Sequence, residues 1–201
     1  MKKLVVLILA FVLCFAGCGA EKEFVPERGT VENGVYKNSA FGIGFEANSD
    51  WYFYSDEEIA ATMGKTAEEL FPEDFAENLE NTETIYDIYA ADYYGGSTIN
   101  INFENINAIY GEIVDEETYL EMAKSEIETN LAAMNILRNE VGKALVSGKE
   151  VPCIFVELEL SGTTVYEVVV VKKVGNWIGI VTLASVSEDG ISSLLENLSF
   201  E

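Results

Sequence analysis

The alternation of apolar and polar residues is clearest over residues 98–104, where it predicts a half-buried β-strand. Ile99, Ile101 and Phe103 fall on one face of this strand, and polar side chains occupy the other. Four β-rich segments occur later in the chain, separated by short turns that contain glycine: residues 136–146, 150–160, 163–173 and 177–184. Because loops this short join antiparallel neighbours, the pattern predicts a C-terminal four-strand meander.

Two stretches of this meander, residues 168–171 and 178–181, are apolar on both faces of their strands. A sheet that is apolar on both faces must be covered on both faces. Helices predicted elsewhere in the chain can supply this cover. We therefore expect an α+β fold built as an α/β/α sandwich, with an antiparallel sheet between helices.

The helical pattern is strongest over residues 115–134, where apolar residues recur every three or four positions. The predicted apolar stripe consists of Leu120, Ala123, Ile127, Leu131 and Met134. Acidic residues 115–117 place negative charge at the N-terminal end, where the helix dipole favours it. Ser187 is the predicted cap of a last helix, which carries Ile191, Leu194, Leu195 and Leu198.

The region before residue 98 predicts short strands and short capped helices. Strands are expected at residues 41–45, 51–54 and 85–93. Capping boxes that begin helices are predicted at Ser55 to Glu58 and at Thr66 to Glu69. Pro72 suits the first turn of a further helical piece that holds Phe75 and Leu79. Gly95-Gly96 makes a hairpin plausible between the strands on either side.

The N-terminus has the three regions of a secretory signal in order. Lys2 and Lys3 precede an uninterrupted apolar run over residues 4–15, and small residues then lead to Cys18. The small pair before Cys18 resembles the lipobox of bacterial lipoproteins, although Phe15 stands where that family usually has leucine. The resemblance implies that Cys18 is lipidated and becomes the new N-terminus. Diacylglycerol on this cysteine supplies the two-chain signal that stable anchoring needs.

Two other interpretations of the N-terminal segment stay open. One is a transmembrane helix, but the run falls short of the roughly 20 apolar residues that cross a bilayer. The other is ordinary secretory cleavage after Ala20. With lipidation preferred, the chain divides into a signal peptide (1–17), a lipidated Cys18 with a flexible tether (18–33) and a single domain (34–201).

Several motifs of the domain follow one another in a recognisable order. They are Gly34-Val35-Tyr36-x-Asn38, Phe41-Gly42-Ile43-Gly44-Phe45, Trp51, an acidic helix, the C-terminal meander and the closing run from Leu194 to Phe200. In this order the chain resembles small bacterial lipoproteins with a PsbP-like fold, over roughly residues 34–201. The resemblance implies a non-catalytic protein, since most members of that superfamily bind other proteins or have no known activity. It supplies no catalytic residue.

The negative net charge of the chain excludes some classes of binding partner. The chain has 12 Lys+Arg against 35 Asp+Glu, a net charge of −23, and loss of Lys2 and Lys3 with the signal makes it more negative. Such a surface repels phosphate backbones, so we expect no nucleic-acid binding. Adhesion to anionic lipid is disfavoured for the same reason, which leaves anchoring to the N-terminal lipid.

Histidine is absent, and only Cys153 remains as a cysteine beyond the predicted lipidation site. The absence of histidine removes the usual general base and the commonest metal ligand. Cys153 lies in an apolar strand with only Lys149 as a nearby cation, which favours a small buried side chain over a nucleophile. We therefore expect no catalytic residue, no metal site and no cofactor.

The abundant carboxylates raise two functional possibilities, a glycosidase-like acid pair and a calcium site. The chain has no EF-hand spacing, and its acidic clusters lie at predicted helix starts, over residues 56–58, 68–69 and 115–117. The helix dipole accounts for acidic residues at such positions. A hydrolase that works through two carboxylates is therefore the third-ranked function.

The aromatic residues between positions 51 and 94 contain the candidate binding surface. Tyr93 and Tyr94 lie at the predicted turn, where burial explains aromatic residues poorly. With Trp51 they form a possible contact surface for sugar rings or for a protein hot spot. Core packing and strand propensity predict the same residue types, so a purely structural role stays open.

Together these features predict a lipid-anchored accessory or protein-interaction module on the extracytoplasmic side of a bacterial cell membrane. The expected partners are the membrane, through the N-terminal lipid, and a protein of unknown identity. The alternative is a small-ligand or glycan-binding lipoprotein that uses the tyrosine-rich surface. Exposed coplanar aromatic rings would favour the glycan binder, and convergent carboxylates in a deep cleft would favour an enzyme.

Overall fold

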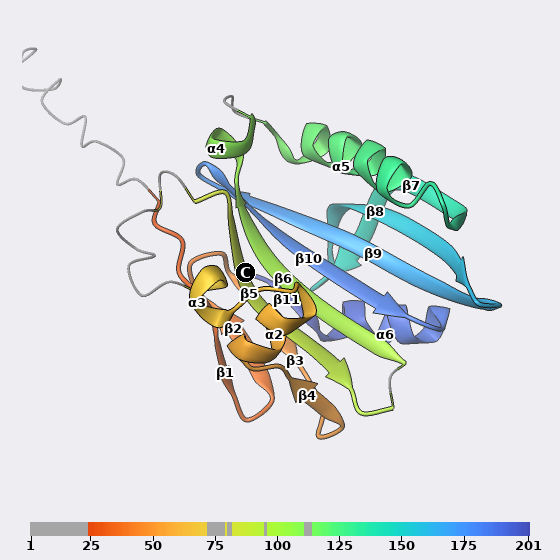
Figure 1. Ribbon diagram of the computed structural model, residues 1–201, viewed down its shortest axis with the longest axis horizontal. Helices are drawn as coiled ribbons and strands as arrows, with labels where there is room; N and C mark the ends of the chain where they lie inside the picture. The colour runs from red at the N-terminus through yellow and green to blue at the C-terminus, as the bar shows by residue number, and fades with distance from the viewer. Residues whose placement is uncertain (1–23, 72–78, 80–81, 95, 111–113) are drawn as a thin grey trace, which may run out of the picture.

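The structure is a computed structural model that describes residues 24–71, 79, 82–94, 96–110 and 114–201 (Figure 1). The predicted signal peptide and the predicted lipidation site, Cys18, lie outside the described residues, as do Pro72 and Phe75 of the predicted helical piece. Within the described ranges, no helix combines the length and the apolar character needed to cross a bilayer.

The main element of the fold is an antiparallel seven-stranded sheet with the order β4-β5-β6-β10-β9-β8-β7. Its strands are β4 (Trp51–Phe53), β5 (Thr84–Asp92), β6 (Ser97–Asn105), β7 (Asn135–Val146), β8 (Lys149–Leu160), β9 (Thr163–Val174) and β10 (Trp177–Ser185). The predicted meander is confirmed as β7 to β10. Ser147-Gly148 and Ser161-Gly162 adopt positive φ angles, 50° and 75° at the first turn and 53° and 82° at the second. This left-handed backbone suits two-residue hairpin turns and matches the twist of the strands.

A second, four-stranded sheet has the order β1-β2-β3-β11. It consists of β1 (Thr30–Glu32), β2 (Val35–Asn38), β3 (Ile43–Glu46) and β11 (Leu198–Phe200), which joins the two ends of the described chain. No pattern in the sequence predicted this sheet, and the periodicity of the last helix included Leu198. Leu198 instead ends that helix and pairs with Phe45 of β3.

The helices are α2 (Asp56–Thr62), α3 (Ala67–Leu70), α4 (Ile106–Tyr110), α5 (Glu116–Asn130) and α6 (Glu188–Asn197). Both predicted capping boxes are present, at Ser55 for α2 and at Thr66 for α3. Helix α5 ends at Asn130, four residues earlier than expected, and Met134 is exposed. Helix α4 was not predicted.

The core has one layer on each face of the seven-stranded sheet, as expected for strands that are apolar on both faces. Val169 and Val171 pack with Leu120 of α5 on one face. Val168 and Val170 pack with Leu194 of α6 and with the small sheet on the other. Figure 1 shows α5 above strands β9 and β10 and α6 below them, on opposite sides of the large sheet. The α+β class and helices on both faces are therefore confirmed, with the second sheet added to the α6 layer.

Residues 24–33 belong to the fold, which corrects the predicted tether for this part of the chain. Phe24 meets Phe41 edge to face, with 5.1 Å between the ring centroids. Residues 30–32 form β1 and pair with β2. Since few residues in this segment are apolar, its contacts could not be read from a hydropathy pattern; they depend on polar groups that lie far away in the sequence.

Candidate functional site

The turn between β5 and β6 holds two tyrosine side chains out of the fold. Asp92 Oδ1 accepts hydrogen bonds from the backbone N–H groups of Tyr94, at 2.9 Å, and Gly96, at 3.0 Å. The N–H of Tyr93 donates to the carbonyl of Asp50 at 2.7 Å. The backbone of the turn is thus tied down at three points, while Tyr93 and Tyr94 are 66% and 86% exposed. Ordered backbone and exposed rings together make this turn a candidate contact surface.

Tyr52 of β4 extends this surface. Its ring centroid lies 6.3 Å from that of Tyr93, with an angle of 43° between the rings. The Tyr52 hydroxyl donates to the Glu58 carboxylate, with oxygen distances of 2.7 and 2.8 Å. That hydrogen bond is the main reason why the pKa of Glu58 is lowered and the pKa of Tyr52 is raised. We call Tyr52, Tyr93 and Tyr94 the tyrosine patch.

Trp51, the third residue of the predicted surface, does not belong to the tyrosine patch. Its ring meets Phe45 of β3 at 5.4 Å in an edge-to-face contact and packs against the core. Successive residues of a strand point to opposite faces, so Tyr52 and Trp51 cannot share one surface. The strand was predicted correctly, but the sequence did not reveal which of its faces is buried.

The geometry of the tyrosine patch suits a protein contact better than a sugar platform. The rings of Tyr52 and Tyr93 are tilted by 43°, whereas a flat sugar-stacking platform needs coplanar rings. Exposed tyrosines provide a large apolar area and a hydroxyl at low conformational cost, and such residues often dominate protein interfaces.

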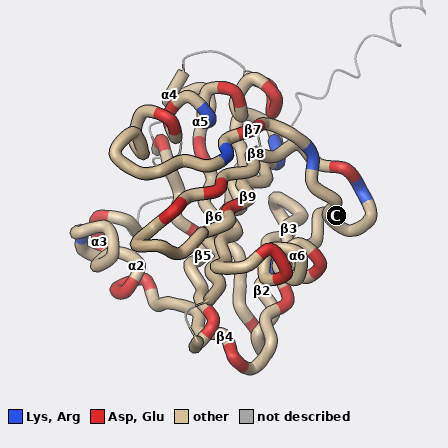
Figure 2. Tube along the Cα trace, turned by 90° about the vertical axis from the view of Figure 1, so that its right-hand side faces the viewer, with Lys and Arg blue, Asp and Glu red and all other residues tan. Residues whose placement is uncertain are grey.

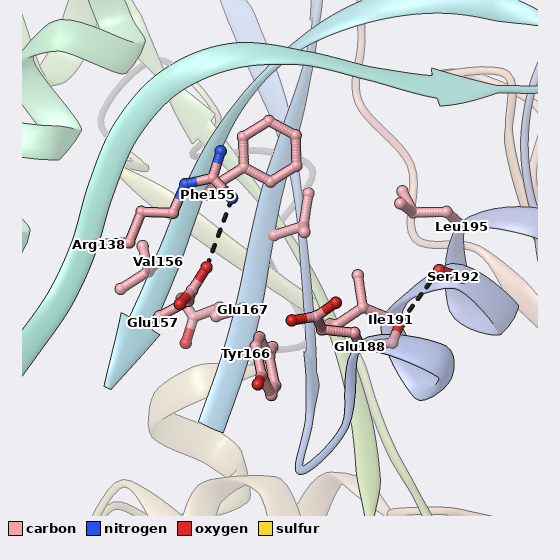
Figure 3. Close-up of a pocket in the computed structure, with 11 residues that line it drawn as sticks. Arg138, Phe155, Val156, Glu157, Tyr166, Glu167, Glu188, Ile191, Ser192 and Leu195 are labelled. Carbon is pink, nitrogen blue, oxygen red and sulfur yellow. Dashed lines mark hydrogen bonds and ion pairs between the residues drawn. The ribbon is translucent and has the colours of Figure 1, made fainter. Parts of the chain in front are cut away.

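A cleft lies between α6 and the strands β7 to β9, and no sequence motif had indicated it (Figure 3). Its volume is about 290 Å³. Apolar side chains, including Phe155, Ile191 and Leu195, line one part of it. The Arg138 guanidinium lies over the Phe155 ring, 4.7 Å from its centroid. The cleft therefore combines an apolar wall with one fixed cation.

Carboxylates flank that cation. Arg138 pairs with Glu140 at 3.1 Å and with Glu157 at 3.5 Å, and Glu188 contributes to the lining from α6 (Figure 3). These residues come from separate elements, and they approach one another only because β7 and β8 are paired and α6 crosses the sheet. Periodicity in the sequence predicts each of these elements but does not predict the cleft.

A buried polar network surrounds Asp87, and no pattern in the sequence had indicated it. A β-bulge between Tyr86 and Ile88 leaves Asp87 without a partner on β6, and its side chain is only 1% exposed. Asp87 accepts hydrogen bonds from the Gly29 N–H at 2.9 and 3.0 Å, from the Tyr36 hydroxyl at 2.5 Å and from the Asn38 amide at 3.2 Å. Burial raises the pKa of Asp87, and these hydrogen bonds oppose that rise.

Arg28 joins the Asp87 network to helix α2. It makes two hydrogen bonds to Asp56, at 2.8 and 2.9 Å, and a third to the Asp87 carbonyl at 2.8 Å. Its guanidinium lies 4.2 Å from the centroid of the Phe71 ring. We call residues 24–29 the N-terminal clasp, because these contacts fasten that segment to the domain. The Asp87 network thus holds the N-terminal clasp on the domain and does not line an open cleft.

The other candidates from the sequence, Cys153 and the acidic residues at helix starts, have roles in packing or helix capping. Cys153 is fully buried, and burial raises the pKa of its thiol to about 11. Asp115 caps α5 by accepting from the Thr118 N–H at 2.8 Å, and the capping boxes engage Glu58 and Glu69. Among the residues that the structure describes, no group of three or more His, Cys, Asp or Glu side chains is placed to hold a metal ion.

No protein-family model and no curated protein sequence matches this chain. Solved structures similar to it include the cyanobacterial PsbP (CyanoP) from Synechocystis sp. PCC 6803, at 9% identity and a TM-score of 0.49 over 94% of this chain and 99% of that protein. LpqN of Mycobacterium tuberculosis, described as involved in cell envelope biogenesis, is similar at 12% identity and a TM-score of 0.41, over 78% of this chain and 82% of LpqN. Both TM-scores are below 0.5, so neither likeness carries an argument about family or function.

Proposed function

We propose that this protein is a lipid-anchored recognition module on the extracytoplasmic side of a bacterial membrane, and that it acts by binding a protein rather than by catalysis. The observation that carries the proposal is the turn at Tyr93 and Tyr94, whose backbone is held by Asp92 and Asp50 while both rings face solvent. The small-residue run that ends at Cys18 supports the anchor. The order of the domain motifs supports membership of the PsbP-like lipoproteins.

The charges around the tyrosine patch indicate what kind of partner surface would fit it. Asp50, Asp92 and Glu58 lie next to the patch and carry negative charge at its rim. Figure 2 shows Asp and Glu spread over most elements of the fold and few basic positions. Complementary charge speeds encounter and excludes partners of like charge. We therefore expect a partner surface with an apolar centre for the two exposed rings and a basic rim.

Site-specific photocrosslinking tests this function. A photoreactive phenylalanine analogue replaces Tyr94 in the full chain, in its own membrane, and a matched variant carries the analogue at Leu145, which is 64% exposed on β7. The proposal predicts one discrete protein adduct from position 94 and none from position 145. Tyr93→Ala in the position-94 variant should weaken that adduct. Equal adducts from both positions, or none from position 94, would contradict the proposal.

A second function, binding of a small amphipathic ligand, is favoured by the cleft at Arg138. Its volume of about 290 Å³ and its mixed apolar and charged lining resemble the lower end of small-molecule sites. Ser192→Phe would fill the cleft from its α6 side. A ligand of this site should raise the melting temperature of the wild-type protein and not that of this variant. A ligand that stabilises both equally binds elsewhere.

A further inference from the structure

The seven-stranded sheet has two ends with different surroundings. The turns at Ser147-Gly148 and at Gly175-Asn176 lie at one end, which we call the proximal end. The turn at Ser161-Gly162 and the tyrosine patch lie at the other, the distal end, because β6 and β10 pair Ser97 with Ser185 there. In Figure 1 the β9–β10 turn is on the left and the β8–β9 turn on the right. The longest strands have 12 residues, so the two ends are about 40 Å apart.

The described chain enters the fold at the proximal end. The Phe24 side chain packs on the β9–β10 turn, where a Cβ added at Gly175 would lie 3.0 Å from the Phe24 Cβ. The N-terminal clasp then holds the next residues through Arg28 and through the Gly29 N–H on Asp87. Any anchor before Phe24 is therefore attached at the proximal end of the sheet.

The correction at residues 24–33 shortens the tether considerably. From Cys18 to Phe24 there are six residue steps, which span at most about 20 Å when fully extended. A tether through Asn33 would have reached about 50 Å. The shorter reach is about half of the distance between the two ends of the sheet, so the anchor keeps the proximal end near the bilayer.

The proximal end also carries lysines on an otherwise acidic protein. Lys172 donates from Nζ to the carbonyl oxygens of Gly42, at 3.2 Å, and Glu201, at 2.8 Å. Lys37 pairs with the Glu201 carboxylate at 3.7 Å. Burial is the main reason why the pKa of Lys172 is lowered, and the positive charge of Lys149 lowers it further. We call Lys37, Lys149 and Lys172 the lysine cluster. Figure 2 shows basic positions grouped near the C-terminal residue.

We propose that the proximal end is a membrane-facing surface, on which the lysine cluster contacts anionic lipid headgroups and the tyrosine patch points away from the bilayer. This inference rests on the proposed lipid anchor. The net charge of the chain disfavours adhesion to anionic lipid as a whole, but contact depends on the charges within a Debye length of the bilayer, about 10 Å at 0.1 M salt. The lysine cluster places three positive charges beside the carboxylates of Glu201 and Glu116, so ammonium groups are available here for headgroup phosphates.

Two matched labels measure the orientation. Ser147 and Ser161 each precede a glycine in a hairpin turn, are exposed and have φ angles of 50° and 53°, so a cysteine at either site meets the same backbone conditions. The full chain is produced in lipidated form as Ser147→Cys or Ser161→Cys, labelled with a fluorophore and reconstituted in vesicles that carry a headgroup-attached quencher. Native Cys153 is buried and stays unlabelled.

The expected result is strong quenching of the label at position 147 and little quenching at position 161. The contrast should be larger in vesicles with phosphatidylglycerol than in purely zwitterionic vesicles, and 1 M salt should reduce it. Replacement of Lys37 and Lys149 by glutamate should remove the effect of the anionic lipid, whereas Lys124→Glu on α5 should not. Equal or reversed quenching in a chain shown to be lipidated overturns the orientation alone. A chain whose Cys18 carries no lipid overturns the anchor and the orientation together.

Discussion

The Asp87 network makes a quantitative prediction about stability. Replacing Asp87 by alanine removes one acceptor that serves the Gly29 N–H, the Tyr36 hydroxyl and the Asn38 amide. Tyr36 and Asn38 are themselves buried, so water cannot readily replace the lost acceptor. Because the N-terminal clasp is fastened partly through Gly29, we expect the variant to lose the docking of this segment as well.

The size of the effect follows from these contacts. A buried donor left without an acceptor costs roughly 1–3 kcal/mol, and removing one side of a buried charged group costs roughly 3–5 kcal/mol. We therefore expect Asp87→Ala to lower the free energy of unfolding by about 4 kcal/mol, which lowers the melting temperature of a domain of this size by about 10 °C. Asp56→Ala removes only a partly exposed partner of Arg28 and should cost less than about 1 kcal/mol.

Urea unfolding followed by near-ultraviolet circular dichroism measures this difference on the lipid-free mature chain, and hydrogen exchange gives a local readout. Exchange at residues 30–32 should accelerate in Asp87→Ala, since β1 is an edge strand whose one partner among the described residues is β2. An Asp87→Ala variant that melts within about 2 °C of wild type, or an Asp56→Ala variant destabilised as strongly as Asp87→Ala, would contradict this prediction.

Three further predictions concern titratable groups and metals. Burial raises the pKa of Glu167, so its contribution to stability is complete below its unfolded pKa and is lost as the pH rises through its folded pKa. Glu167→Gln should therefore gain urea resistance over wild type at pH 7, and the gain should vanish below about pH 4; a gain that does not vary with pH would contradict this. Cys153, with a pKa of about 11, should react with a thiol reagent at pH 8 only after unfolding, and rapid labelling of the native protein would show a different environment. The melting temperature should be the same with and without EDTA, and a calcium-dependent rise of several degrees would identify a metal site.

Local patterns in the sequence predicted the elements that depend on nearby residues. The meander followed from alternating residues and short glycine turns, and the two capping boxes followed from Ser55 and Thr66 with a glutamate three positions later. Each of these signals lies within a few residues, so a single sequence is sufficient to recognise it. The doubly apolar strand over residues 168–171 also predicted cover on both faces, which α5 and α6 provide.

The candidate site could be predicted only in part. The exposed turn at Tyr93 and Tyr94 was recognisable because aromatic residues next to glycines are poorly explained by burial. Trp51 was assigned to the same surface wrongly, since strand alternation does not say which face meets the core. Tyr52, its neighbour, is the residue that joins Tyr93.

The sequence by itself thus determined the fold class and the order of the strands in the meander. It also excluded general-base catalysis and metal binding by histidine, because the chain has no histidine. Tertiary structure alone decided the second sheet, the cleft at Arg138 and the burial of Asp87, because each joins residues far apart in the chain. Gly29 and Asp87 are 58 positions apart, and no local periodicity relates them. Periodicity records which residues share a face of one element, whereas the pairing of faces depends on the packing energy of the whole domain.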